Sequence, residues 1–178
     1  MANITVFCAG ASGNHPAHQD AAKRLGTSIA TRGHTLVYGG ASGGLMGILA
    51  ESALAAGGRV IGILPQVLQK REIGHPRLTE LRIVASMAER KNMLLDLADA
   101  VVALPGGLGT LDELFEAATW AQIGIKTFPI GAVNVDGYYD HMFAFLDRAA
   151  MDGLLQLPYR GLVRSAPTPD AVLDMLGM

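Results

Sequence analysis

Short apolar runs alternate with amphipathic helix-like segments along this whole chain, and this alternation restricts the possible folds most. Near-continuous apolar strands separated by helices are typical of a parallel sheet that helices cover on both faces. The sequence therefore predicts an α/β fold, a Rossmann-like doubly wound parallel sheet in a single domain over residues 1–178. The runs with the length and β-branched content of buried strands are 4–9, 35–38, 60–64, 81–84, 100–104 and 128–133.

Composition excludes several classes of protein. Half of the 178 residues are hydrophobic and 17% are charged, which is typical of a globular chain. The net charge of −2, without a stripe of Lys and Arg, predicts no nucleic-acid partner. No run approaches the roughly 20 apolar residues of a membrane span, and the first residues lack the basic region of a signal peptide. The single cysteine, Cys8, fits a reducing compartment, so we expect a cytoplasmic protein without membrane contact.

A proline and three glycines stand where the run 100–104 gives way to apolar residues at helical spacing, in the segment Pro-Gly-Gly-Leu-Gly-Thr-Leu-Asp-Glu at 105–113. Glycines let the backbone approach a ligand closely. A helix N-terminus presents unpaired N–H groups and a partial positive charge, both of which bind phosphate. The segment therefore predicts a phosphate site beside the carboxylate of Glu113.

Glu113 has a second possible role, because Thr110-x-x-Glu113 matches the capping box at the start of a helix. Helical spacing places Glu113 away from the core stripe of this helix, and Trp120 shares the face of Glu113. An indole in that position indicates a pocket wall or a contact between subunits.

Arg90 follows another capping box, Ser86-x-x-Glu89, and shares a helix face with apolar residues such as Met87. An arginine on an apolar face needs an anionic partner. That partner can be structural, with Glu72 or Glu89 as candidates, or it can be a ligand, and the helix position alone favours neither. The predicted phosphate loop on the next strand favours the ligand.

Two more glycine-rich segments follow strand-like runs, at 39–47 and at 10–14. Each can be a tight turn packed with small residues. The segments 39–47 and 105–113 are two glycine loops at two strand ends, and together they favour one shared cleft, which makes Gly43 and Gly44 candidates for substrate binding. The segment 10–14 is predicted to be structural.

The motifs that are missing are also informative. No segment matches G-x-x-x-x-G-K-[ST], and none matches G-x-G-x-x-G, because Asp112 stands at the third glycine position. His15 and His18 are three residues apart but have no carboxylate at ligand spacing. We therefore expect no cofactor and no metal. The remaining histidines are predicted to lie on the surface: His34, His75 and His141.

Several motifs of this chain occur together in one known family. They are P-G-G-x-G-T-x-x-E at 105–113, M-x-x-R-K at 87–91 and a turn close to G-G-x-x-G-L-M-G at 39–47, supported by 119–124 and 134–139. On these motifs, and over nearly its whole length, the chain resembles the Lonely Guy family of cytokinin-activating phosphoribohydrolases. Members of the wider superfamily are known for binding nucleotides or the molybdenum cofactor.

The resemblance implies hydrolysis of the N-glycosidic bond in N6-modified adenosine 5′-monophosphates, which releases the free base and ribose 5-phosphate. It implies that Arg90 and Glu113 are the catalytic pair, and that the protein is a homodimer with its active site near the interface. The residues implied to hold the phosphate or to contact other parts of the nucleotide are Gly106, Gly107, Gly109, Thr110, Lys91, Glu72 and Thr119.

Two positions depart from the family pattern, because Ala88 replaces a common histidine and Asp112 a common glutamate. A non-catalytic carrier of a nucleotide or of the molybdenum cofactor is the alternative function. Lysine decarboxylation, a label often given to related sequences, is rejected because it needs pyridoxal phosphate on a lysine. Only Lys91 lies in a motif, beside Arg90. The choice between a cytokinin nucleotide and AMP as substrate stays open.

Overall fold

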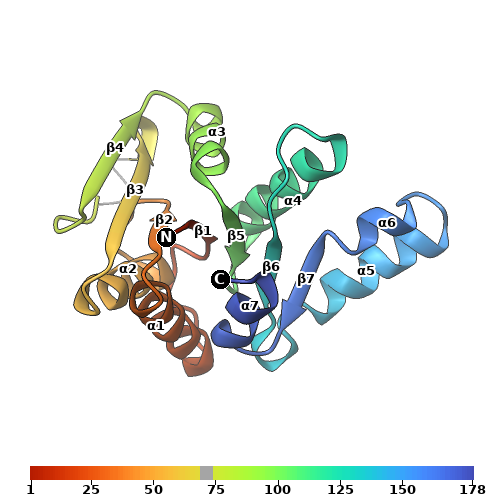
Figure 1. The fold of residues 1–178 in the computed structure, drawn as a ribbon, viewed down its shortest axis with the longest axis horizontal. Coiled ribbons are helices and arrows are strands. Elements are labelled where there is room, and N and C mark those ends of the chain that lie inside the picture. The colour runs from red at the N-terminus through yellow and green to blue at the C-terminus, as the bar shows by residue number, and fades with distance from the viewer. Residues whose placement is uncertain (69–73) are drawn as a thin grey trace.

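The computed structural model describes residues 1–68 and 74–178, and it contains a seven-stranded sheet in the order β4-β3-β2-β1-β5-β6-β7 (Figure 1). All six neighbouring pairs of strands are parallel. The strands are β1 (Asn3–Phe7), β2 (Thr35–Tyr38), β3 (Arg59–Pro65), β4 (Glu80–Val84), β5 (Ala100–Ala103), β6 (Ile130–Val133) and β7 (Val163–Ala166).

Helices cover both faces of the sheet. One hydrophobic cluster joins the sheet to α1, α2 and α7, and a second cluster joins its other face to α3 and α4. The predicted doubly wound, Rossmann-like α/β fold is therefore confirmed. The helices are α1 (Pro16–Thr31), α2 (Gly44–Ala55), α3 (Met87–Leu97), α4 (Leu108–Ile123), α5 (Asp140–Met151), α6 (Leu157–Arg160) and α7 (Pro169–Leu176), with two 3₁₀ turns, η1 (Gln66–Leu68) and η2 (Val135–Gly137).

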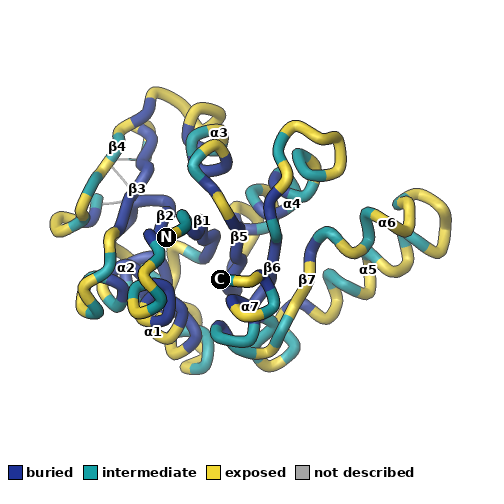
Figure 2. Tube along the Cα trace, in the orientation of Figure 1, coloured by how far each residue is buried: buried dark blue, intermediate teal, exposed yellow. Residues whose placement is uncertain are grey.

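Strand β5 shows why the central strands are mostly apolar. Ala100 and Val102 belong to the cluster under α1, α2 and α7, while Val101 and Ala103 belong to the cluster under α3 and α4. Successive side chains of a strand point to opposite faces, so both sets of side chains in a strand covered on both faces are buried and favour apolar residues. The exception on β1 is the buried Thr5, whose hydroxyl donates to the Leu94 carbonyl at 3.0 Å. Figure 2 shows the centre of the sheet buried accordingly.

All six predicted strands are present, with ends that differ from the prediction by at most two residues. Strand β7 was missed, because its sequence Val-Arg-Ser-Ala has one buried residue and it lies at the sheet edge. The helix that was predicted to follow a cap at Thr110 begins three residues earlier, at Leu108, with Gly107 as its N-cap. No helix among the described residues has the length and apolar composition to cross a membrane.

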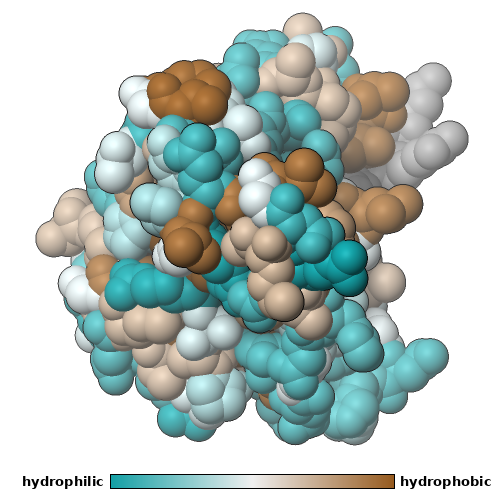
Figure 3. All heavy atoms as spheres, turned by 90° about the vertical axis from the view of Figure 1, so that its right-hand side faces the viewer, coloured by the Kyte–Doolittle hydropathy of each residue, from teal (hydrophilic) through white to brown (hydrophobic). Residues whose placement is uncertain are grey.

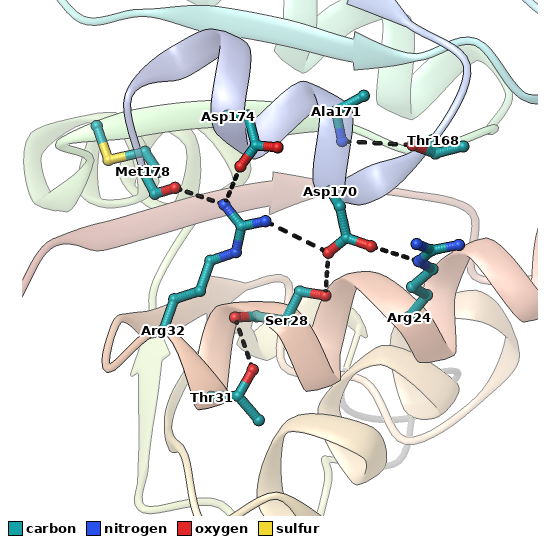
Figure 4. A network of polar contacts seen from close by, with 9 residues as sticks. All are labelled: Arg24, Ser28, Thr31, Arg32, Thr168, Asp170, Ala171, Asp174 and Met178. Carbon is teal, nitrogen blue, oxygen red and sulfur yellow. Dashed lines mark hydrogen bonds and ion pairs between the residues drawn. The ribbon is translucent and has the colours of Figure 1, made fainter.

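A polar network fixes the C-terminal helix on α1 (Figure 4). Ser28 donates a hydrogen bond of 2.6 Å to Asp170, which also pairs with Arg24. Arg32 binds both Asp174, at 2.6 Å, and the carbonyl of Met178, at 2.7 Å. The hydrogen bond from Ser28 and the two arginines lower the pKa of Asp170. This network holds α7 on the face opposite to α3 and α4.

The order of the strands reverses direction between β1 and β5, which makes this the topological switch point of the sheet. Phe7 and Ala103 are paired in register there, so the loops after the two strands leave the sheet at the same level. In open α/β sheets, ligands bind in the crevice outside the carboxyl ends of the strands at this point. The predicted phosphate loop at 105–109 is one of these two loops.

Candidate active site

A cavity of about 440 Å³ lies at the switch point. The loop after β1, the end of the loop after β5 and the first two turns of α4 form its walls, and α2, η1 and α3 complete it. It contains both predicted catalytic residues and part of the glycine loop. The lining residues are Cys8, Ala9, Gly10, Ala11, Met46, Leu68, Met87, Arg90, Gly107, Gly109, Thr110, Asp112 and Glu113.

The glycine loop places the N-terminus of α4 at the wall of the cavity. Gly107 is the N-cap residue, and no side chain caps this helix. A Cβ on Gly106 would lie 2.0 Å from Oγ1 of the buried Thr110, so only glycine allows this close approach. The Tyr138 hydroxyl donates a 2.7 Å hydrogen bond to the Gly106 carbonyl and holds the loop from the other side. The first N–H groups of α4 have no partner within the helix and suit an anion.

Glu113 lies on the second turn of α4, so the capping-box reading of Thr110 and Glu113 was wrong. Because α4 begins at Leu108, Thr110 is already inside its first turn. Burial raises the pKa of Glu113 to about 7, although the positive charge of Arg90 acts in the opposite direction. A carboxylate that is costly to ionise, facing a cavity beside an arginine, is typical of a functional site.

Arg90 reaches the cavity from α3 and is 6% exposed. Its Nη2 donates to the Gly39 carbonyl at 3.3 Å, and its Nε has no hydrogen-bond partner among the described residues. A buried donor without an acceptor is costly, and a ligand in the cavity could supply the acceptor.

Glu89 and Glu72 are the two carboxylates that the sequence offers as structural partners of Arg90. Glu89 is exposed and accepts a hydrogen bond of 2.7 Å from the backbone N–H of Ala85, while its own N–H donates to Ser86. It therefore caps α3, as the sequence predicted, and is not the partner of Arg90. Glu72 lies outside the described residues.

Two predicted substrate contacts lie next to the cavity rather than in its wall. Lys91 pairs with Asp112 at 3.1 Å and with Glu116 at 2.8 Å, and so it connects α3 to α4. Thr119 is exposed, and its hydroxyl donates to the Phe115 carbonyl at 2.7 Å. Both residues line a shallow depression beside the cavity.

The glycine segment 39–47 packs against the loop that follows β1. Gly43 is the N-cap of α2 and Gly44 has a φ of +59°, and neither lines the cavity. A Cβ on Gly44 would lie 2.1 Å from the carbonyl oxygen of Gly10. Gly10, which the sequence assigned a structural role, lines the cavity instead.

Sequence reasoning missed the apolar part of the cavity, which is formed by Cys8, Met46 and Met87. Burial raises the pKa of the Cys8 thiol, so the residue acts as a small apolar group there. The signal that could have found Cys8 is its position directly after the first strand, at the carboxyl edge of the sheet.

The fold and the cavity define a Rossmann-like α/β protein with a glycine-rich helix N-terminus at the switch point of its sheet. A family model described as "Possible lysine decarboxylase" matches residues 46–176. The chain is 44% identical over 170 residues to the probable cytokinin riboside 5′-monophosphate phosphoribohydrolase LOGL1 of Oryza sativa subsp. japonica, covering 96% of this chain and 76% of the rice protein. The chain belongs to this Lonely Guy (LOG) family.

Two more comparisons concern the family and the fold. Cytokinin riboside 5′-monophosphate phosphoribohydrolase LOG1 of Arabidopsis thaliana is 42% identical over 173 residues, which cover 97% of this chain and 81% of the plant protein. The molybdenum cofactor carrier protein of Chlamydomonas reinhardtii superposes with a TM-score of 0.75 at 23% identity, covering 99% of this chain and 96% of the algal protein. At that identity the superposition shows a shared fold alone.

Proposed function

We propose that this protein hydrolyses the N-glycosidic bond of N6-modified adenosine 5′-monophosphates and releases the free base and ribose 5-phosphate. The observation that carries the proposal is one cavity that combines Glu113, Arg90 and the uncapped N-terminus of α4. The names of the rice and Arabidopsis relatives support the same reaction.

The residues of the cavity suit each part of this reaction. The bond between the sugar C1′ and the base nitrogen breaks with its electrons leaving on the base, and water adds to C1′, through a transition state like an oxocarbenium ion. The water loses one proton as it adds, and the base nitrogen gains one proton as it leaves. Ionised Glu113 offsets the positive charge that grows on the sugar or orients the water. Arg90 cannot donate a proton at ordinary pH, so it binds an anionic group or the departing base.

The phosphate is assigned to the start of α4, where Gly107, Gly109 and Thr110 line the cavity. Binding energy at the phosphate, which does not react, holds the sugar in the reactive position. Lys91 and Thr119 are proposed as further substrate contacts through the depression beside the cavity.

The name of the family model does not fit the lysines of this chain. A decarboxylase of this kind needs a lysine free to hold pyridoxal phosphate in the cavity. Lys91 is held by two carboxylates, and Lys126 donates to the carbonyl of Leu95 at 2.9 Å. Lys23 lies at the surface beside Asp20. None of these three lines the cavity, and Lys70 is outside the described residues.

The phosphate assignment predicts a strong preference for monophosphates. Purified protein should release free base from N6-isopentenyl-AMP or AMP without added metal or cofactor, and EDTA should not change the rate. The matching ribosides should react about 100-fold more slowly in kcat/KM, because they lack the group that anchors the sugar. Chromatography of the products measures both rates. Equal turnover of riboside and monophosphate would contradict the phosphate site, and ligand binding without turnover would favour the carrier function.

We also propose that the protein is a cytoplasmic homodimer that buries the outer face of α4. Ile123 and Ile125 are 62% and 59% exposed there, and with Trp120 they line the depression beside the cavity. Asp112 lines both the cavity and this depression, so a second copy would adjoin the active site. By contrast, the face that carries α5 and α6 shows separate apolar patches among hydrophilic residues (Figure 3).

Substitution of Ile123 by glutamate tests the dimer. The charge would be buried without a partner in the interface, so we expect Ile123→Glu to be monomeric by light scattering at micromolar concentration while the wild-type protein is a dimer. Ala55→Glu, at an exposed position on α2, is the control and should remain dimeric. A fully active wild-type monomer would refute this interface.

A further inference from the structure

His75 is buried, contrary to the surface position expected from the sequence. It is 3% exposed, and its Nε2 lies 3.0 Å from Oε1 of Glu51 on α2. Its Nδ1 accepts a hydrogen bond of 3.3 Å from the backbone N–H of Arg77. Because Nδ1 accepts, the ring proton is on Nε2 and is donated to Glu51. Arg77 also pairs with Glu51, so the imidazole is fixed at both nitrogens.

The backbone around His75 holds the turn that follows β2. The N–H of His75 donates to the Gly40 carbonyl at 3.0 Å, and Gly74 pairs with Ala41 in an antiparallel bridge. Gly40 has a φ of +81°, a conformation that the turn needs and that glycine adopts without strain.

The three carbonyls of this turn have three different donors. Gly39 accepts from Arg90 at 3.3 Å, Gly40 accepts from the N–H of His75, and Ala41 accepts from the hydroxyl of the buried Tyr38 at 3.1 Å. The carbonyl that binds Arg90 and the carbonyl that binds His75 therefore belong to consecutive residues of one short turn.

Arg90 also lies directly against this turn. A Cβ on Gly39 would be 2.1 Å from Nη2 of Arg90, so the guanidinium fills the space that a side chain would take. A small shift of the turn would move the guanidinium relative to Glu113. Among the described residues, the Gly39 carbonyl is the hydrogen-bond acceptor of the Arg90 guanidinium.

We propose that His75 is a positioning residue for Arg90: held by Glu51, it fixes the turn 39–41 on which the Arg90 guanidinium rests. The role of Arg90 in the reaction rests on the proposed function, but the placement of Arg90 beside Glu113 does not. His75 itself does not line the cavity and touches no reacting atom.

The first experiment compares two substitutions of His75. His75→Ala should lower kcat by about 10- to 100-fold with little change in KM, because a displacement of the order of 1 Å at a catalytic group has an effect of that size. His75→Gln keeps an N–H that can reach Glu51 and should recover much of the loss. The control is His34→Ala, at the opposite end of β2, where a half-buried histidine accepts from the N–H of Ala2; its kcat should be unchanged.

The second experiment needs no turnover and uses carbon-13 NMR of labelled glutamate carboxyls. Arg90 lowers the pKa of Glu113, which burial raises to about 7, while Lys91 lowers it and Asp112 and Glu116 raise it. If Arg90 moves away, the pKa of Glu113 rises. His75→Ala should therefore raise it and His75→Gln should largely restore it, whereas loss of a purely structural contact leaves it unchanged in the folded protein.

Glu51 provides variants that should fold even if His75→Ala does not, because its side chain is 47% exposed. Glu51→Ala should raise the pKa of Glu113, and Glu51→Gln, which keeps an acceptor for His75, should raise it less. An unchanged pKa of Glu113 in both His75→Ala and Glu51→Ala would overturn the proposal. A wild-type protein that binds AMP but releases no base would overturn the proposed function and leave this NMR result to decide the positioning role.

Discussion

Glu113→Gln is expected to lower kcat by about 10²–10³ and to leave the protein folded and able to bind AMP. The neutral amide has nearly the shape of the carboxylate but cannot offset positive charge on the sugar, and removal of one such electrostatic contact has an effect of this size. Single-turnover measurement of base release, with AMP binding followed by calorimetry, separates the chemical step from binding.

The same substitution should make the protein more stable at alkaline pH. The pKa of Glu113 is about 7 in the folded protein, against the ordinary pKa of 4.5 for a free glutamate. A carboxyl that ionises less readily when folded costs stability as the pH rises from about 4.5 to 7, and this cost then stays constant. Glu113→Gln removes it, so the variant should be more stable by on the order of 1–3 kcal/mol at pH 8 and equally stable at pH 4.

Glu89→Gln is the matched control, because Glu89 is a helix cap and capping boxes accept glutamine. It should keep wild-type kcat and show no gain in stability at pH 8. Urea denaturation at pH 4 and pH 8 measures the stability of both variants. Wild-type turnover by Glu113→Gln would show that Glu113 has no catalytic role.

Arg90→Met should also lower kcat by about 10²–10³. Methionine has a similar length and suits the apolar surroundings of a side chain that is 6% exposed, so the fold should survive. The variant loses the cation beside Glu113, and the pKa of Glu113 should rise because Arg90 lowers it. The acidic limb of the pH–rate profile should therefore move to higher pH, since more alkaline conditions are needed to ionise Glu113.

Arg82→Met is the control for Arg90→Met. Arg82 lies on β4 and pairs with Glu80 at 2.7 Å, and it does not line the cavity. Its kcat and its pH–rate profile should match those of the wild-type protein. If Arg90→Met retains an unchanged pH–rate profile, Arg90 does not set the ionisation of Glu113, and the proposed pair does not act together.

The local pattern of residues was enough to predict six of the seven strands and the N-terminal cap of α3. Strands covered on both faces require continuous apolar runs such as that of β5, and Ser86 caps α3 through a contact three residues away. The glycine loop could be found for the same reason, because a strand end, glycines and a helix start are consecutive in the chain. The start of α4 was misplaced by three residues, since Gly107 caps this helix without a side chain that a motif could show.

The sequence alone therefore determined the class of fold, the glycine loop at the end of β5 and the candidacy of Arg90 and Glu113. Only the tertiary structure decided that the loop after β1 joins the cavity, that Glu89 is not the partner of Arg90, and that His75 is buried against Glu51. The physical reason is distance along the chain. Helix caps and strand patterns arise from neighbours within a few residues, whereas Arg90 and its acceptor Gly39 are 51 residues apart and meet only because parallel strands bring their carboxyl ends to one edge.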